Sequence, residues 1–195
     1  MNLVANNKIP QFETPRLILK KISLEDASSY QKYFNDYEII GHLAAHVPWP
    51  YPEDGAYQFI KNVIIPKSGQ NQWMWGIFLS SNRNNLIGVI DLYRTDALDN
   101  RGFWLAKDYW GQGLMIEALT PITDYAFNEL NFSELKLSNA LGNISSRRIK
   151  EKQGARFVGI RNAKFVNPKY TQAEDWILTK SDWENKKHES INLTT

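Results

Sequence analysis

The sequence predicts an α/β protein in which helices flank a twisted sheet that is mixed but mostly antiparallel. Residues 72–79 and 86–93 are apolar, strand-like runs on either side of the polar turn 80–85, a pattern typical of a β-hairpin. Residues 103–106 and 135–138 are two further strands separated by one long helical pattern, which predicts a right-handed crossover between parallel neighbours. Antiparallel and parallel pairs are therefore both expected.

The other elements follow from local signals. Residues 14–22 alternate apolar and basic side chains, which predicts a strand with one solvated face. Ser23 is a typical N-cap with acidic residues after it, so a helix is expected from there to about residue 35. Alternating prolines in the segment 40–52 exclude both a helix and a central strand. We further expect helices over 53–65 and 144–153, strands over 156–160 and 175–179, and a polar segment, 180–195, that is frayed or helical only at its start.

Length and composition limit the class of protein. A chain of 195 residues is about one domain, and we expect a single domain over residues 1–195 with a core of about 14–183. The net charge of +2 without a basic block argues against nucleic acid as a partner. No apolar run reaches membrane-spanning length and residues 1–11 lack a signal-peptide core, so we expect a cytoplasmic protein with no membrane partner. The absence of Cys excludes disulfides, thiolate nucleophiles and Cys-type zinc sites, and no metal site is predicted.

A glycine-rich turn is the most informative feature of the chain. Gly111 and Gly113 follow the strand at 103–106 and open a helix whose apolar residues recur at helical spacing. The free N–H groups and the positive dipole end of a helix start form a site for phosphate. A Walker loop is excluded because Leu114 follows the second glycine, and a dinucleotide loop is disfavoured because Ile116 takes the place of the third glycine. A tight turn without a ligand remains the alternative.

The residues around this turn resemble a known family. The run 109–119 resembles the acyl-CoA pyrophosphate loop of the GNAT N-acetyltransferases, and more narrowly that of the ribosomal-protein (Rim-type) branch, although Asp108 stands where the family usually has Arg or Gln. The segment 143–157 is similar to the second GNAT signature, with Asn143 and then Ser146 three residues later. With the N-terminal strand and the Trp-Pro-Tyr-Pro segment, the resemblance spans most of residues 14–183.

The resemblance implies a GNAT fold in which two parallel strands splay apart at the cofactor site. It also implies acetyl-CoA as acetyl donor, coenzyme A as product, and direct attack by a primary amine in a ternary complex. Backbone N–H groups near Leu105 and Ala106 are expected to face the acetyl group, and Asn143 to bond the pantetheine arm unless it is only a helix cap. The implied cofactor-binding residues are Trp104, Leu105, Ala106, Gly111, Gln112, Gly113, Leu114, Met115, Ile116, Asn143, Ser146 and Arg148, the last of which could instead belong to a solvated basic face.

Two positions at which the family often carries catalytic groups differ in this chain. Many GNAT members carry a Tyr acid seven residues after the motif Asn, and here that position is Lys150. The resemblance to the Rim-type branch therefore points to Ser146 as the catalytic residue, with a first-turn cap as the alternative. Asn100 stands where Rim-type members often have a Glu base. The candidate bases that remain open are Asp91, Glu117, Glu174, Asp175 and, through water, His42 and His46.

The acceptor is expected to be an amine, either a protein N-terminus or a small molecule such as a polyamine, an aminoglycoside or an amino acid. The residues predicted to line its pocket are His46, Trp49, Tyr51, Asp91 and Tyr93, although Trp49 could instead pin its loop to the core. The protein is expected to be a monomer or a homodimer. A catalytically degenerate acyl-CoA-binding or sensing protein is the alternative function, because the usual Tyr and Glu are missing.

Overall fold

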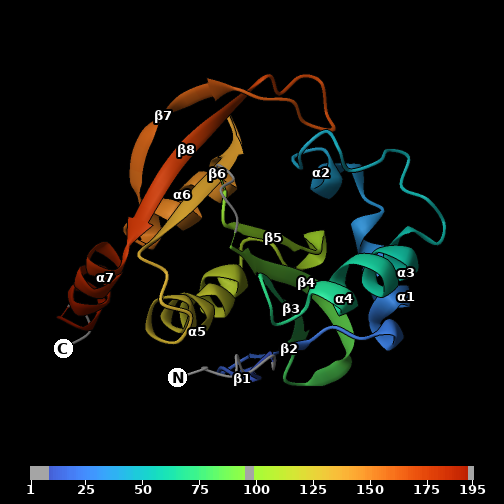
Figure 1. The fold of residues 1–195 in the computed structure, drawn as a ribbon, viewed down its shortest axis with the longest axis horizontal. Helices are drawn as coiled ribbons and strands as arrows, with labels where there is room; N and C mark the ends of the chain where they lie inside the picture. The colour runs from blue at the N-terminus through green and yellow to red at the C-terminus, as the bar shows by residue number, and fades with distance from the viewer. Residues whose placement is uncertain (1–8, 95–98, 193–195) are drawn as a thin grey trace.

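The computed structural model describes residues 9–94 and 99–192, which form two antiparallel sheets with helices around them (Figure 1). The first sheet has five strands in chain order, β1 (Phe12–Glu13), β2 (Leu17–Lys21), β3 (Gln72–Leu79), β4 (Asn82–Tyr93) and β5 (Arg101–Leu105). The second sheet places β8 (Gln172–Thr179) between β6 (Glu134–Ala140) and β7 (Arg156–Asn162). The predicted α/β class is confirmed.

The hairpin of β3 and β4 is the centre of the first sheet. Trp75 lies opposite Ile90, and both side chains are fully buried. The predicted turn over 80–85 is wrong beyond residue 81, because β4 begins at Asn82, opposite Leu79. Backbone pairing does not need apolar side chains, so this polar segment extends the ladder beyond the apolar pattern.

Helices cover both faces of this sheet. On one face, 3₁₀ helix η1 (Leu24–Asp26) and helix α1 (Ala27–Phe34) follow Ser23, whose N–H donates to the Asp26 carboxylate at 2.8 Å in a capping box. The same face is covered by α2 (Tyr37–Ile40) and by a run of α3 (Gly55–Phe59), the π-helical η2 (Ile60–Ile64) and α4 (Ile65–Lys67), where one helix over 53–65 was predicted.

The opposite face of the five-stranded sheet packs against α5 (Leu114–Asn128). Successive side chains of β2 belong to two different hydrophobic clusters. Leu17 and Leu19 belong to the cluster that contains α5, whereas Ile18 belongs to the cluster that contains α1. The expectation of a solvated face on this strand is therefore wrong at residues 17–19. The covering helices come from distant segments, so the strand's own alternation of residues could not reveal the second core.

The two sheets meet at one end and then part (Figure 1). The Asn100 N–H donates to the Lys136 carbonyl at 2.8 Å, and the Asn100 side chain accepts from the Lys136 N–H at 3.0 Å. Beyond this junction, β5 and β6 share no ladder within the part of the chain that the structure describes. The predicted pairing of 103–106 with 135–138 is wrong, and the strands instead splay, as the resemblance to the GNAT fold implied.

Two helices complete the second half of the chain. Helix α6 (Ile144–Lys152) begins at Asn143, whose side chain accepts from the Ser146 N–H, and is followed by Gly154 at φ +84°. Helix α7 (Lys180–Asn192) corrects the expectation of a frayed segment. Its Trp183 is buried and donates to the Asp124 carboxylate of α5 at 2.7 Å. Within residues 9–94 and 99–192, no helix is both long and apolar enough to cross a membrane.

Candidate active site

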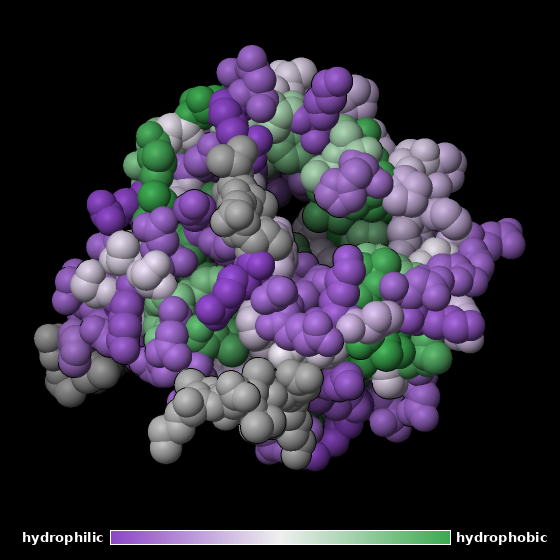
Figure 2. Space-filling view, in the orientation of Figure 1, coloured by the Kyte–Doolittle hydropathy of each residue, from purple (hydrophilic) through white to green (hydrophobic). Residues whose placement is uncertain are grey.

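A cavity of about 860 Å³ opens where β5 and β6 part. Figure 2 shows the molecule hollowed at this place, with hydrophobic side chains along one wall of the opening. The lining comes from the ends of β4 and β5, the glycine turn, β6, the first turns of α6, and the segment after α2. The cavity therefore joins the glycine turn to the polar ends of three strands.

The glycine turn forms one end of this cavity. The short helix η3 (Lys107–Tyr109) leads into Gly111 and Gly113, at φ +74° and +76°, and α5 begins at the next residue. A Cβ on Gly111 would meet no atom within 4 Å, and one on Gly113 would meet only the Arg16 guanidinium at 3.8 Å. The first N–H groups of α5 have no acceptor inside the helix, so an anion can approach them over open space. The apolar residues Leu114, Met115 and Ile116 also line the cavity.

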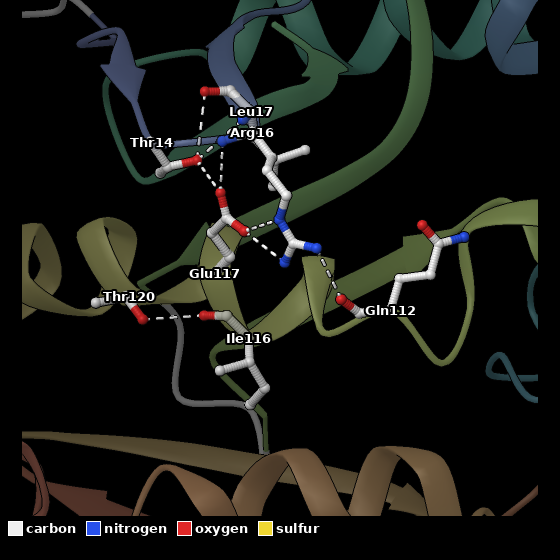
Figure 3. Close-up of polar contacts among 7 residues, drawn as sticks. All are labelled: Thr14, Arg16, Leu17, Gln112, Ile116, Glu117 and Thr120. Atoms are coloured by element: carbon white, nitrogen blue, oxygen red, sulfur yellow. Dashed lines mark hydrogen bonds and ion pairs between the residues drawn. The ribbon is translucent and has the colours of Figure 1, made fainter. Parts of the chain in front are cut away.

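An ion pair braces the glycine turn from behind (Figure 3). Arg16 donates to the Glu117 carboxylate at 2.7 Å and to the Gln112 carbonyl at 3.0 Å, and Thr14 donates to Glu117 at 2.6 Å. Burial raises the pKa of Glu117, but the hydrogen bonds from Thr14 and Arg16 outweigh it and hold the pKa below its usual range. Glu117 is thus an ionised structural group outside the cavity, which corrects its candidacy as a base.

Gln112 and Asp108 belong to the outer side of this turn. The Gln112 side chain donates to the Asp108 carbonyl at 3.0 Å, and both residues line a separate surface depression together with Arg16. The structure therefore does not bring the Gln112 side chain to the cavity, although Gln112 was predicted to bind the cofactor. The carboxylate of Asp108 likewise lies away from the cavity lining.

The wall formed by β5 presents one free edge. The Ala106 N–H donates to the Ile87 carbonyl of β4 at 2.8 Å and Ala106 is fully buried, so the expectation that this N–H faces a ligand is wrong. The Leu105 carbonyl instead accepts from the Trp110 indole at 2.7 Å, away from β4. Because the groups of an antiparallel strand alternate, the Leu105 N–H also points to the open side. Trp104 and Leu105 both line the cavity.

Two carboxylates, Asp91 and Asp99, lie where β4 and β5 face β6. Asp91 lies opposite Gly102 in the ladder, and a Cβ at Gly102 would collide with the Asp91 carboxylate and displace it. Burial, and then repulsion from Asp99, raise the pKa of Asp91 to about 7. Burial also raises the pKa of Asp99, which accepts from Ser138 at 2.8 Å. Tyr93 lines the cavity beside them, and burial raises the pKa of its hydroxyl.

The α6 side of the cavity carries Ser146 and a buried lysine. The Lys150 ammonium donates to the Ser146 hydroxyl at 2.8 Å, and Lys150 is only 2% exposed. Burial, followed by the positive charge of Arg101, lowers the pKa of Lys150 to about 7. Asn143 and Arg148 line the cavity on the same side. Sequence reasoning missed the burial of Lys150, because lysine is normally a surface residue.

The remaining candidate bases are held in ion pairs. Glu174 is buried against Arg147 and accepts from the Asn139 amide at 2.9 Å; burial raises its pKa, but these hydrogen bonds outweigh that effect and lower it. Asp175 pairs with Arg161 at 2.9 Å.

Asn139, which the sequence did not single out, lines the cavity, and its side-chain oxygen is buried with no partner in the described part of the chain.

The proline-rich loop is only partly a cavity wall. His46 lines the cavity, and so does His42, which hydrogen-bonds the Tyr170 hydroxyl at 3.0 Å. Trp49 is 41% exposed and packs on Tyr37, with the ring centroids 5.0 Å apart. Tyr51 packs edge-on against Phe34 at 4.9 Å. The structure thus does not bring Trp49 and Tyr51 to the cavity, because aromatic neighbours on α1 and α2 hold them elsewhere.

Two splayed strands beside a glycine turn at a helix start define the GNAT class of acetyltransferase folds. The sequence profile of the acetyltransferase (GNAT) domain matches residues 16–156, more than half of the chain, and the chain belongs to this family. YdaF of Bacillus subtilis (strain 168), provisionally named a ribosomal N-acetyltransferase, is 31% identical over 107 residues, 53% of this chain and 58% of YdaF. YjcK of the same organism, named a probable N-acetyltransferase, is 34% identical over 93 residues, 46% of this chain and 51% of YjcK. The matches thus span little more than half the length of these relatives.

Solved structures agree with the fold. The ribosomal-protein-S5-alanine acetyltransferase of Vibrio fischeri superimposes with a TM-score of 0.74 at 16% identity, over 89% of this chain and 98% of that one. The ribosomal L7/L12 α-N-protein acetyltransferase RimL, in complex with coenzyme A, superimposes with a TM-score of 0.72 at 16% identity, over 88% of this chain and 97% of that one. The resemblance to the GNAT family that the sequence indicated is confirmed, and the names of these similar proteins agree with the resemblance to its Rim-type branch.

Proposed function

We propose that this protein is an N-acetyltransferase that moves the acetyl group of acetyl-CoA to a primary amine. One observation carries the proposal: a single cavity connects the anion-binding start of α5 with Asp91, a carboxylate that has no ion-pair partner among the described residues. The coenzyme A bound in the RimL complex and the names of the relatives support the same chemistry.

The residues around the cavity suit the parts of such a donor. The N–H groups at the start of α5 and the open turn at Gly111 and Gly113 would hold the pyrophosphate. The Leu105 N–H, which points to the open side of β5, offers a donor to the amide-rich pantetheine arm. Acetyl-CoA would supply the activated acyl group as a thioester, and the protein would supply position and proton transfer.

Asp91 is the group we assign as the general base. An amine attacks only when its nitrogen lone pair is free, and the nitrogen must lose a proton as the new bond forms. Because burial and Asp99 raise the pKa of Asp91 to about 7, its carboxylate takes up a proton more readily than an ordinary aspartate near neutral pH. Ser146, on the opposite wall of the cavity, would face the leaving sulfur.

The acceptor we favour is a protein N-terminus. Relatives and structural neighbours carry names that refer to ribosomal proteins, and the cavity opens to solvent where a chain end could enter. When ionised, Asp91 and Asp99 in the cavity lining would attract the ammonium form of an incoming amine, which loses a proton before it attacks. Small amines share that charge, so the acceptor class has to be measured.

Thiol release from acetyl-CoA across a panel of amines tests the proposal. The panel contains peptides with free N-terminal Ala or Ser, the same peptides already N-acetylated, a polyamine, an aminoglycoside and amino acids. We expect release with at least one free-amine peptide and none with its acetylated control. Binding of acetyl-CoA without thiol release for any amine would contradict the proposal and would identify an acyl-CoA-binding protein instead.

A further inference from the structure

Lys150 is a buried cation that the proposed reaction has not yet used. It lies on α6, is 2% exposed, and occupies the place at which the GNAT resemblance leads one to expect a Tyr acid. Fully buried lysines are rare because the ammonium loses its hydration. A methionine would fill the same space without that cost, so the burial of this charge calls for a functional reason.

The Lys150 ammonium contacts the hydroxyl of Ser146. It donates to the Ser146 hydroxyl at 2.8 Å, and it forms no ion pair within 4 Å with any carboxylate of residues 9–94 and 99–192. Arg101 from β5 repels it, whereas Asp99 before β5 and Glu174 on β8 attract it. The Phe103 ring centroid lies 5.7 Å from the ammonium.

The balance of these effects favours proton release near neutrality. Burial and Arg101 together outweigh the two carboxylates and lower the pKa of Lys150 to about 7. Lys150 is therefore a much stronger acid than a solvated lysine, whose pKa is about 10.4. A serine hydroxyl by itself is a poor proton donor, but a hydroxyl that accepts from an ammonium can pass a proton on.

We propose that Lys150 is the proton source for the departing thiolate and that it acts through the Ser146 hydroxyl. This inference rests on the proposed acetyl transfer. Lys150 is a positioning residue in this scheme, because Ser146 and not Lys150 lines the cavity that would hold the sulfur.

The amine nitrogen forms a bond to the acyl carbon and loses one proton to Asp91, while the carbon–sulfur bond breaks and its electron pair stays on sulfur. Ser146 gives its hydroxyl proton to the sulfur and takes one from the Lys150 ammonium, which becomes a neutral amine. After coenzyme A leaves, Lys150 regains a proton through Ser146 from the opened cavity, and Asp91 releases one to solvent.

The pH profile of kcat at saturating amine tests this role. A general acid must be protonated, so the wild-type kcat should fall as the pH rises past the pKa of Lys150, near 7 in the free protein. Lys150→Met should lower kcat by about 10²-fold, the lower end of the range for positioned general acids, and should abolish the alkaline fall. The Kd of acetyl-CoA from calorimetry should stay within about twofold.

Ser146→Ala and matched controls separate this relay from a structural role. Ser146→Ala should give the same loss and likewise abolish the alkaline fall, and the double variant should lose little more, because the two residues act as a unit. Lys136→Met removes an exposed lysine of β6 and should keep the wild-type profile. A Lys150→Met enzyme that retains the alkaline fall would overturn the proposal.

If Lys150→Met fails to fold, a variant that keeps the positive charge and a direct titration still test the proposal. Lys150→Arg retains the cation, but guanidinium is a far weaker acid, so kcat should fall and the alkaline limb should move beyond pH 9. NMR titration of ¹³C-lysine protein should show one Lys side chain, absent from the Lys150→Arg spectrum, that titrates near 7. If that lysine stays protonated to pH 10, the inference fails even though acetyl transfer stands. If wild-type protein releases no thiol with any amine, the proposed function fails first.

Discussion

At the scale of single residues, the site depends on which charges are left unpaired. Glu117, Glu174 and Asp175 each face an arginine, whereas Asp91 faces a glycine and another carboxylate. An arginine stabilises the ionised form of a carboxylate, and burial beside a like charge destabilises it. The pKa values of Glu117 and Glu174 are lowered, whereas that of Asp91 is raised to about 7, which suits Asp91 to accept a proton near neutral pH.

Asp91→Asn tests this assignment with a change of charge and almost none of shape. Because the raised pKa of Asp91 keeps it protonated below about 7, the wild-type rate should fall as the pH drops through that value. Asp91→Asn should lower kcat by about 10²- to 10³-fold and abolish this acid limb, measured by thiol release. Asp175→Asn, which removes a paired carboxylate outside the cavity, should retain the limb. An Asp91→Asn enzyme with the wild-type pH profile would show that another group is the general base.

The same pKa predicts a stability effect of the opposite sense. A carboxyl group whose pKa is raised from 3.8 in the unfolded chain to about 7 in the folded protein contributes its full stability only below about 3.8, and this contribution is lost as the pH rises from there through about 7. Asp91→Asn should therefore be more stable than wild type at pH 8 and show less of that loss. Reversible denaturant unfolding at pH 5 and pH 8 measures both values. A gain in stability with a loss of rate is expected of a group kept for catalysis.

At the scale of elements, the turn before α5 combines backbone strain with function. Gly113 has φ +76°, a conformation that costs other residues roughly 1–2 kcal/mol. Gly113 lines the cavity, and the pair of Arg16 and Glu117 fixes the turn from outside the cavity (Figure 3). The turn is thus held in one shape by contacts on the side away from the cavity, which leaves the helix N–H groups free for a phosphate.

Gly113→Ala tests the phosphate assignment of this turn. The added Cβ should strain the apo protein by about 1 kcal/mol and lower the affinity for acetyl-CoA at least tenfold, measured by thermal melting and calorimetry. Gly154→Ala is the matched control, because Gly154 also has positive φ and lies at the far end of α6. It should destabilise the protein as much or more, with wild-type affinity. Equal affinities of the two variants for acetyl-CoA would contradict the assignment of the phosphate to this turn.

At the scale of the whole molecule, the two sheets are joined by a shared apolar core around α5 and by polar contacts at one end. Asn100 and Lys136 join them at the base of the cavity, and α5 leads from one sheet to the other (Figure 1). The C-terminal helix adds a second connection, since Trp183 of α7 is buried and bonds Asp124 of α5. The cavity can stay open between the strands because these connections hold the sheets elsewhere.

Trp183→Ala tests the importance of this second connection. Loss of a buried tryptophan side chain should reduce the free energy of unfolding by about 3–5 kcal/mol, measured by denaturant unfolding, while the Kd of acetyl-CoA changes little. Trp183→Phe keeps most of the packing and removes the bond to Asp124, so it should cost only about 1 kcal/mol. A Trp183→Ala protein as stable as wild type would show that α7 contributes nothing to holding the sheets.

Much of the fold was predictable because it depends on local chemistry. The capping box at Ser23, the cap at Asn143 and the positive φ of Gly154 involve residues within a few positions of each other, so the sequence by itself set where α1 and α6 begin or end. The glycine turn and its helix follow from the same kind of signal. A family resemblance added the splay of β5 and β6, which no strand pattern reveals.

The chemistry of the site was decided only by the tertiary structure. Whether a carboxylate is a base or half of an ion pair depends on a partner far away in the chain, such as Arg16 for Glu117 or Arg147 for Glu174. The acidity of Lys150 likewise arises from its burial and from the charge of Arg101 on β5, and Trp49 turns outward because Tyr37 holds it. Local propensity specifies the elements, whereas desolvation and charge pairing arise only once distant elements pack, so the proton-transfer roles belong to the folded protein.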